Sequence, residues 1–315
     1  MRKYLLPDSM PYYKANLHSH STFSDGVKTP EEMKEMYKEK GYSVLAFTDH
    51  GKFITHNELT DEEFVIINGY EADVTEPVDD PEYVYRRTCH ACILAPSPSV
   101  ESAPHPSECG VGYTAERINE LIRRCREEGF FVTYNHPRWS RERYPEYMSY
   151  KGMHCFEIIN FNCIAGGTPE WDEAEYDDLL SRGDKIYCLA ADDNHNTKWF
   201  NDSFGAYTMI GAERLDYEHI FDALMKGRFY ASEAPEIKCV YYEDGCISVF
   251  TSPARSIRFN TGTRRTQNSN ADDGTITSAS FKLKLTDKYV RITVTDENGK
   301  LAHTSAFWLE DFMEQ

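Results

Sequence analysis

The sequence predicts an α/β fold, built as a barrel or a doubly wound sheet and followed by a small antiparallel β module. From about residue 14 to 232, short apolar runs alternate with amphipathic helical stretches. Strands separated by helices favour parallel pairing through right-handed crossovers. After Pro235 the pattern changes to short alternating strands with Gly- and Asn-rich turns. We therefore predict two domains, residues 1–235 and residues 236–315.

The first predicted unit shows the repeating pattern most clearly. Residues 14–17 form a strand, and Thr29-Pro30-Glu31-Glu32 then begins a helix, with Thr29 as N-cap and a capping box. Gly41 supplies the left-handed stop, and residues 43–48 (SVLAFT) form a buried strand.

The same alternation continues along the chain. Further strands are predicted at residues 64–68, around residue 90, and at 130–134, 155–161 and 185–190, with helices at 114–128, 169–182 and 217–226. In the β module, strands at 237–243 and 247–251 flank the hairpin signal Asp244-Gly245. Strands follow at 289–295 and 306–309, and the polar stretch 256–277 is interpreted as loops.

Composition limits the classes of partner. The 315 residues include 34 basic and 52 acidic side chains, a net charge of −18, which disfavours duplex nucleic acid and anionic membranes. An anionic substrate remains possible if bound cations reverse the local sign. The N-terminus has no secretory h-region and no apolar run spans a membrane, so we expect a cytoplasmic protein. The nine cysteines, including Cys89-x-x-Cys92, are expected to be buried thiols.

Histidine and carboxylate side chains recur at the predicted strand ends. In a parallel barrel the carboxyl ends of all strands meet on one face, where active sites are built. The alternating pair His18-Ser19-His20 directs two imidazoles to the same side, which suits a metal ion. The candidates at these positions are His18, His20, Asp25, Asp49, His50, Glu71, His90, His136, Asp192, Asp193 and His195. Together they predict a polynuclear metal site.

These motifs closely resemble the PHP (polymerase and histidinol phosphatase) superfamily. The resemblance rests on residues 16–26 (NLHSHSTFSDG), 48–50 (TDH), 135–137 (NHP) and 193–195 (DNH), and extends over roughly residues 14–232. It implies a distorted (β/α)7 barrel of the PHP type, with a C-terminal β extension, that binds two or three divalent ions. Zinc, manganese and iron all suit a mixed His/carboxylate site.

The resemblance also implies how the ligands are shared. His18, His20, Glu71 and Asp193 would hold the first metal; Glu71 would bridge to a second held by His90 and His136; Asp25, His50 and His195 would hold the third. Asp73 is an alternative to Glu71 on the same strand face, and Asp193 is preferred to Asp192 because the family pattern is Asp-x-His. Asp49 is expected to orient the cluster.

Metal ions lower the pKa of a bridging water, so we expect a metal-bridging hydroxide, held through Glu71 and Asp193, to be the nucleophile. Arg138 is a candidate for binding a substrate phosphate, the alternative being an ion pair with neighbouring acids; Lys198 and Arg141 are weaker candidates. Residues 139–150 are expected to cover the site and influence substrate preference.

The leading functional hypothesis is a phosphoesterase acting on a small phosphorylated metabolite or nucleotide. Hydrolysis of a carboxylic ester, amide or carbamate is the alternative, because the same nucleophile attacks carbonyl groups. A third hypothesis is a metal-stabilised binding protein without catalysis. A nuclease role is disfavoured by the acidic charge.

Overall fold

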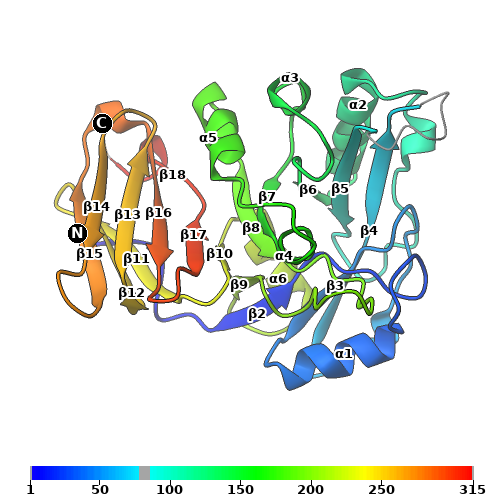
Figure 1. The fold of residues 1–315 in the computed structure, drawn as a ribbon, viewed down its shortest axis with the longest axis horizontal. Helices are drawn as coiled ribbons and strands as arrows, with labels where there is room; N and C mark the ends of the chain where they lie inside the picture. Colours follow the sequence, from blue (N-terminus) through cyan, green and yellow to red (C-terminus); the bar gives the residue numbers. More distant parts are fainter. Residues whose placement is uncertain (1, 78–85, 314–315) are drawn as a thin grey trace.

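The computed structural model describes residues 2–77 and 86–313, and it contains one large and one small sheet (Figure 1). The large sheet runs in the order β14-β13-β16-β17-β10-β9-β2-β3-β4-β5-β6-β7-β8, and the small sheet in the order β1-β11-β12-β15. The central strands are β2 (Tyr12–Asn16), β3 (Val44–Phe47), β4 (Val65–Thr75), β5 (Thr88–Leu94), β6 (Phe131–Tyr134), β7 (Cys155–Asn160), β8 (Tyr187–Ala191), β9 (Tyr207–Gly211) and β10 (Phe229–Ser232). The mixed α/β class is therefore as predicted.

Helices surround these central strands. They are α1 (Pro30–Glu39), α2 (Ala115–Glu127), α3 (Tyr144–Tyr147), α4 (Phe161–Ala165), α5 (Glu173–Arg182) and α6 (Tyr217–Met225), with 3-10 turns η1 (Asn57–Leu59), η2 (Pro106–Glu108), η3 (Leu285–Asp287) and η4 (Leu309–Asp311). None of the helices in the described part of the chain is both long enough and apolar enough to cross a bilayer.

Helix α1 begins as its sequence predicts and connects the helical layer to the strand ends. The Thr29 hydroxyl accepts from the Glu32 amide at 3.3 Å, and the Glu32 carboxylate accepts from the Thr29 amide at 3.0 Å. This capping box satisfies two amides that the first turn leaves without helical partners. On the buried face, the Tyr37 hydroxyl donates to Asp192 Oδ2 at 2.8 Å, just beyond β8.

The expectation of uniformly parallel pairing is wrong at β5. The pairs β2–β3, β3–β4, β6–β7 and β7–β8 are parallel, but β5 is antiparallel to both β4 and β6. Only 12 residues (76–87) separate β4 from β5, and they include Pro77 and Pro81, which disfavour a crossover helix. β5 accordingly pairs with β4 in the opposite direction.

A closed (β/α)7 barrel is not confirmed, because no strand ladder among the described residues joins β8 to β2. The two ends are connected in other ways. Ser19 and Asn194, just past β2 and β8, form an isolated parallel bridge. The Thr208 hydroxyl on β9 donates to the Ala190 carbonyl at 2.8 Å, which fixes β8 against β9. The seven strands thus form an open, barrel-like sheet whose far edge packs on β9.

The C-terminal strands are antiparallel, as predicted. They are β11 (Ile237–Glu243), β12 (Cys246–Ala254), β13 (Ser256–Thr261), β14 (Thr266–Asn270), β15 (Ile276–Lys282), β16 (Tyr289–Thr295), β17 (Leu301–Thr304) and β18 (Phe307–Trp308). The hairpin at Asp244-Gly245 joins β11 to β12. The interpretation of residues 256–277 as loops is wrong, since β13 alternates buried Ile257 and Phe259 with polar residues and pairs with β16.

Backbone pairing crosses the predicted domain boundary at residue 235. The N-terminal strand β1 (Lys3–Leu6) pairs with β11, and β10 pairs with β17, so each predicted domain contributes strands to both sheets (Figure 1). The division into residues 1–235 and 236–315 stays a prediction. These ladders join the β module to β10 and, through β9, to the central strand β2.

Candidate metal centre

The predicted metal ligands lie together beside the ends of the central strands. Among the described residues, four groups have donor atoms within 4.8 Å of one another: His18, His20, Glu71 and Asp193; His20, Asp25, His50 and His195; His50, Glu71 and His90; and His18, His136 and Glu157. All nine ligands that the family resemblance implies occur in these groups, and Glu157 is the one addition. Most of these side chains are buried, whereas Asp25 is largely exposed.

The carboxylate of Glu71 is the centre of the cluster. Its Oε1 lies 3.1 Å from His90 Nδ1 and 3.2 Å from both His18 Nε2 and His136 Nε2. Its Oε2 lies 3.0 Å from His50 Nδ1 and 3.5 Å from His20 Nε2. One fully buried carboxylate therefore faces five imidazoles, while Asp73 is exposed.

Asp193 lies opposite Glu71 in the inner group, which consists of His18, His20, Glu71 and Asp193. Its Oδ1 lies 2.9 Å from His20 Nε2 and 3.1 Å from His18 Nε2, and these two ring nitrogens are 3.2 Å apart. Asp192, by contrast, accepts from Tyr37 and from three backbone amides of the turn 204–206, so it is a structural residue. The geometry thus distinguishes the two aspartates in the way the motif predicts.

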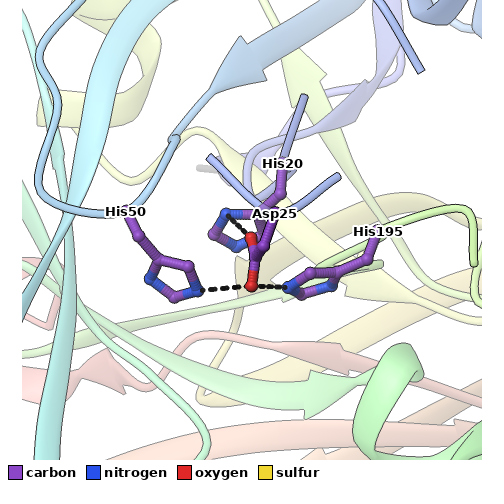
Figure 2. Close-up of side chains that lie close together, drawn as sticks. All are labelled: His20, Asp25, His50 and His195. Carbon is purple, nitrogen blue, oxygen red and sulfur yellow. Dashed lines mark ion pairs between the residues drawn. The ribbon is translucent and has the colours of Figure 1, made fainter. Parts of the chain in front are cut away.

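The outer group consists of His20, Asp25, His50 and His195, and its three histidines face Asp25 (Figure 2). Asp25 Oδ1 lies 3.8 Å from His20 Nδ1, and Oδ2 lies 3.7 Å from His50 Nε2 and 3.5 Å from His195 Nε2. Asp49 is buried beneath this loop and accepts from the Ser21 amide and hydroxyl, each at 2.8 Å. Asp49 orients the loop that carries Asp25, as predicted.

The backbone at two cluster residues adopts a conformation that side chains rarely take. Asp193 has a φ of 54° and His136 a φ of 27°. A strained backbone conformation persists only where neighbouring contacts hold it in place, and such conformations are most common at functional sites. Here Asn160 donates to Asp193 Oδ2 at 3.1 Å and Asn135 donates to Glu71 Oε1 at 3.0 Å.

Electrostatics keep the central carboxylates ionised. Burial acts to raise the pKa of Glu71, but His90, His18 and His50 lower it well below its usual value. Burial likewise opposes ionisation of Asp193, and His18 and His20 lower its pKa below its usual value. Burial lowers the pKa of His20 to about 4, which favours the neutral imidazole that a metal requires.

The donor set fits divalent cations. Glu71 Oε2 and His20 Nδ1 are buried, and within the described part of the chain neither makes a well-aligned hydrogen bond, although Glu71 Oε2 lies 3.0 Å from His50 Nδ1. Buried polar atoms are normally paired, so these two are available as ligands. Donor atoms about 2.0–2.2 Å from a shared ion lie roughly 3–4 Å apart, which is the spacing in both the inner and the outer group.

Residues 16–182 match the sequence model of the PHP domain, which is more than half of the chain. The chain belongs to the PHP domain family. The matched residues include seven of the nine candidate ligands, all except Asp193 and His195.

The chain is also similar to two solved structures and, over a short segment, to one curated protein. A two-domain protein from Bacteroides vulgatus that contains a predicted PHP-like metal-dependent phosphoesterase covers 97% of this chain and 98% of its own, with 16% identity and a TM-score of 0.50. A candidate metal-dependent phosphoesterase from Bifidobacterium adolescentis covers 59% of this chain and 89% of its own, with 16% identity and a TM-score of 0.41. The DNA polymerase/3'-5' exonuclease PolX of Bacillus subtilis is 46% identical over 50 residues, 16% of this chain and 9% of that protein.

Arg138 of this PHP domain does not join the cluster. Its guanidinium donates to Glu175 from Nε at 3.2 Å and from Nη2 at 3.3 Å, and Nε lies 2.9 Å from Asp172 Oδ1. The structure therefore shows the ion pair that the sequence left as the alternative to phosphate binding. Lys198 Nζ lies 5.0 Å from the ring centre of Trp199, and exposed Arg141 has a φ of 61°.

Sequence reasoning missed Glu157 of β7. Its Oε1 lies 2.9 Å from His18 Nδ1, and Asn160 donates to its Oε2 at 2.9 Å. The signal was available, because a lone glutamate interrupts an otherwise apolar strand and charged residues are rarely buried unless paired. The remaining histidines do not enter the four groups in the described part of the chain, and Cys89 and Cys92 are buried free thiols.

Proposed function

We propose that this PHP protein is a metal-dependent phosphoesterase that hydrolyses a small phosphorylated substrate. The observation that carries the proposal is the buried Glu71 carboxylate, whose two oxygens face five histidines. A buried anion surrounded by imidazoles and a second carboxylate is the arrangement that polynuclear hydrolases use to hold cations. Family membership supports the same conclusion.

Each ligand has a proposed place. His18, His20, Glu71 and Asp193 form the first site; Glu71, His90 and His136 form the second; and Asp25, His50 and His195 form the third. His20 belongs to both the first and the third site, since its Nε2 faces Asp193 and its Nδ1 faces Asp25. Glu71 reaches His50 as well, so it connects all three.

Bound divalent cations supply Lewis acidity, which generates a nucleophile from water near neutral pH and stabilises negative charge on phosphoryl oxygens. The side chains of this chain hold those charges in place. Glu157 and Ser140 contact the Nδ1 atoms of His18 and His136, at 2.9 Å and 3.1 Å, so each ring keeps its Nε2 directed at Glu71. The arrangement leaves one open side, towards Trp139 and Trp199, for substrate.

The test is a substrate panel on purified protein whose metal content is quantified. Phosphate monoesters, phosphodiesters, nucleotides and aryl carboxylic esters are assayed for the wild type and for His18→Ala and Asp193→Ala. We expect release of phosphate from monoesters, falling to background in both variants, because each removes a ligand of the inner site.

The matched control is His219→Ala, since His219 contacts Asp216 at the start of α6, outside the cluster. It should retain wild-type activity. Hydrolysis of carboxylic esters alone would replace this proposal with the carbonyl alternative. Full metal content with no turnover of any ester would instead support a binding protein.

A further inference from the structure

A cavity of about 280 Å³ opens over the cluster, and its outer walls are aromatic. The floor is formed by cluster residues, including Glu71 and Asp193, and the walls include Trp139, Trp199 and Phe200. These rings are unusually exposed: Trp139 is 46% exposed and Trp199 is 77% exposed. Large apolar side chains exposed at the mouth of a polar site indicate a ligand-binding surface.

Trp139 is held in a fixed position beside the cluster. Its ring centre lies 5.2 Å from that of His136 and 5.5 Å from that of His90. Its backbone amide donates to Glu170 Oε2 at 3.0 Å, and the next amide, of Ser140, donates to the His136 carbonyl at 3.1 Å. Trp139 is therefore a rigid wall directly above two proposed ligands.

The turn that carries Trp199 and Phe200 forms the second wall. Buried Asp202 anchors this turn by accepting from the His195 amide at 2.7 Å and from the Asn196 amide at 3.0 Å. Phe200 packs tightly against the end of α4, where a Cβ on Gly166 would lie 3.2 Å from its ring. No ring contact joins Trp139 to Trp199 in the described part of the chain, so the space between the walls is open.

The cavity has neither lysine nor arginine among its described lining residues. Arg138 is paired with Glu175 and Asp172, and Lys198 Nζ lies 5.0 Å from the ring centre of Trp199, at the outer wall. The undescribed residues 78–85 (VDDPEYVY) include neither lysine nor arginine. Cations held by the cluster would compensate substrate charge at the floor of the cavity, so we expect the anionic part of a substrate to lie there.

We propose that the substrate carries a flat aromatic ring, held between Trp139 and the Trp199–Phe200 turn, and a single phosphate on the floor of the cavity. This inference rests on the proposed phosphoesterase function and specifies its substrate class. The ring belongs to an aryl group or to a nucleoside base. Both stack on indole, and such stacking raises affinity by about 5- to 150-fold per ring, which corresponds to about 1–3 kcal/mol. Chains of two or three phosphates are disfavoured, because their outer phosphates would extend beyond the cations held at the floor.

The experiment measures kcat/KM for phenyl phosphate, a nucleoside 5′-monophosphate, the matching triphosphate and glycerol phosphate. We expect the wild type to prefer at least one ring-bearing monophosphate to glycerol phosphate by about tenfold or more. Trp139→Leu and Trp199→Leu should each reduce that preference severalfold. The two monophosphates identify whether the ring is an aryl group or a base.

Trp171→Leu is the matched control. Trp171 is also partly exposed, but its indole Nε1 donates a hydrogen bond to Glu233 Oε2 and its ring does not line the cavity. This substitution should leave the preference unchanged. We call the binding of a ring between Trp139 and the Trp199–Phe200 turn the aromatic clamp. Equal turnover of ring-bearing and ring-free phosphates would overturn the clamp but not the phosphoesterase function. An equal loss of activity on all substrates in Trp139→Leu would do the same. A preference for the triphosphate also overturns the clamp.

A binding measurement separates this inference from the failure of catalysis. In metal-loaded protein, phenylphosphonate should quench tryptophan fluorescence at lower concentration than methylphosphonate quenches it, and Trp139→Leu should remove the difference. Quenching by phenylphosphonate without turnover of any phosphate would support the clamp and contradict the phosphoesterase. Equal binding of both phosphonates contradicts the clamp.

Discussion

Glu157 Oε1 lies 2.9 Å from His18 Nδ1, and both side chains are buried. Because Glu157 accepts the Nδ1 proton, it selects the tautomer in which Nε2 of His18 presents a lone pair to the cluster. A partner of this kind fixes ring orientation and raises ligand basicity. Glu157 is therefore a positioning residue for the first proposed site.

We predict that Glu157→Gln weakens metal binding about 10- to 100-fold while the protein stays folded. Gln retains the shape of the side chain but lacks the charge that stabilises this tautomer. The measurement is metal affinity by competition with a chelator, together with metal content. Glu142→Gln is the matched control, since Glu142 is also buried but bonds tyrosines. Unchanged affinity in Glu157→Gln would contradict the assigned role.

The two groups of ligands should differ in how firmly they hold metal. The side chain of Asp25 is 56% exposed, whereas that of Asp193 is 6% exposed and lies within hydrogen-bond distance of His18 and His20. We predict that Asp25→Asn loses one metal equivalent and keeps the others, while Asp193→Asn loses the inner metal as well. Elemental analysis of both purified variants checks this. Equal stoichiometry in the two variants would show that the sites are not independent.

Much of the candidate site was predictable because its residues follow strands in short, recognisable motifs. His18 and His20 follow β2, His136 follows β6 and Asp193 follows β8. The carboxyl ends of parallel strands meet at one face, so the sequence predicted that these side chains would lie near one another. Two other residues reach the same place for different reasons. Glu71 lies in the middle of the long strand β4, and His90 lies near the start of β5, which runs in the opposite direction.

The remaining features depend on contacts between distant segments. The reversal of β5 follows from its pairing with β4 and β6, which no local periodicity encodes. The β13–β14 hairpin was missed because its polar edge strand, Thr266–Asn270, lacks apolar alternation. The pairing of Arg138 with Glu175 spans 37 residues, so sequence could only leave it as an alternative.

Arg291 connects the β module to helix α5, and we predict that Arg291→Met destabilises the protein by about 3 kcal/mol. The guanidinium is 1% exposed and bonds Asp177 at 2.7 Å through both Nε and Nη2, and Glu173 at 2.9 Å. Methionine fills the volume but leaves Asp177 without its arginine partner and, among the described residues, Glu173 paired only with Arg258. Chemical denaturation measures the loss. Arg123→Met, which removes an exposed i,i+4 pair with Glu127, should cost less than about 1 kcal/mol.

The tyrosine-bound carboxylate of Glu142 should make stability depend on pH. Tyr113, Tyr134 and Tyr150 all donate to this buried side chain. Burial is the largest influence on the pKa of Glu142 and raises it to about 7, against the opposing effect of the three hydroxyls. Between the unfolded pKa, about 4.5, and this folded value, the folded state holds a proton that the unfolded state has lost.

The raised pKa of Glu142 therefore stabilises the folded protein at low pH. Stability from this group is complete below the unfolded pKa and is lost as pH rises through the folded pKa, by an amount on the order of 3 kcal/mol. Glu142→Gln mimics the protonated acid at every pH, so its unfolding free energy should increase relative to the wild type between pH 5 and pH 8. Urea denaturation at saturating metal measures this difference. Parallel pH profiles for the two proteins would show that Glu142 titrates normally in the folded state.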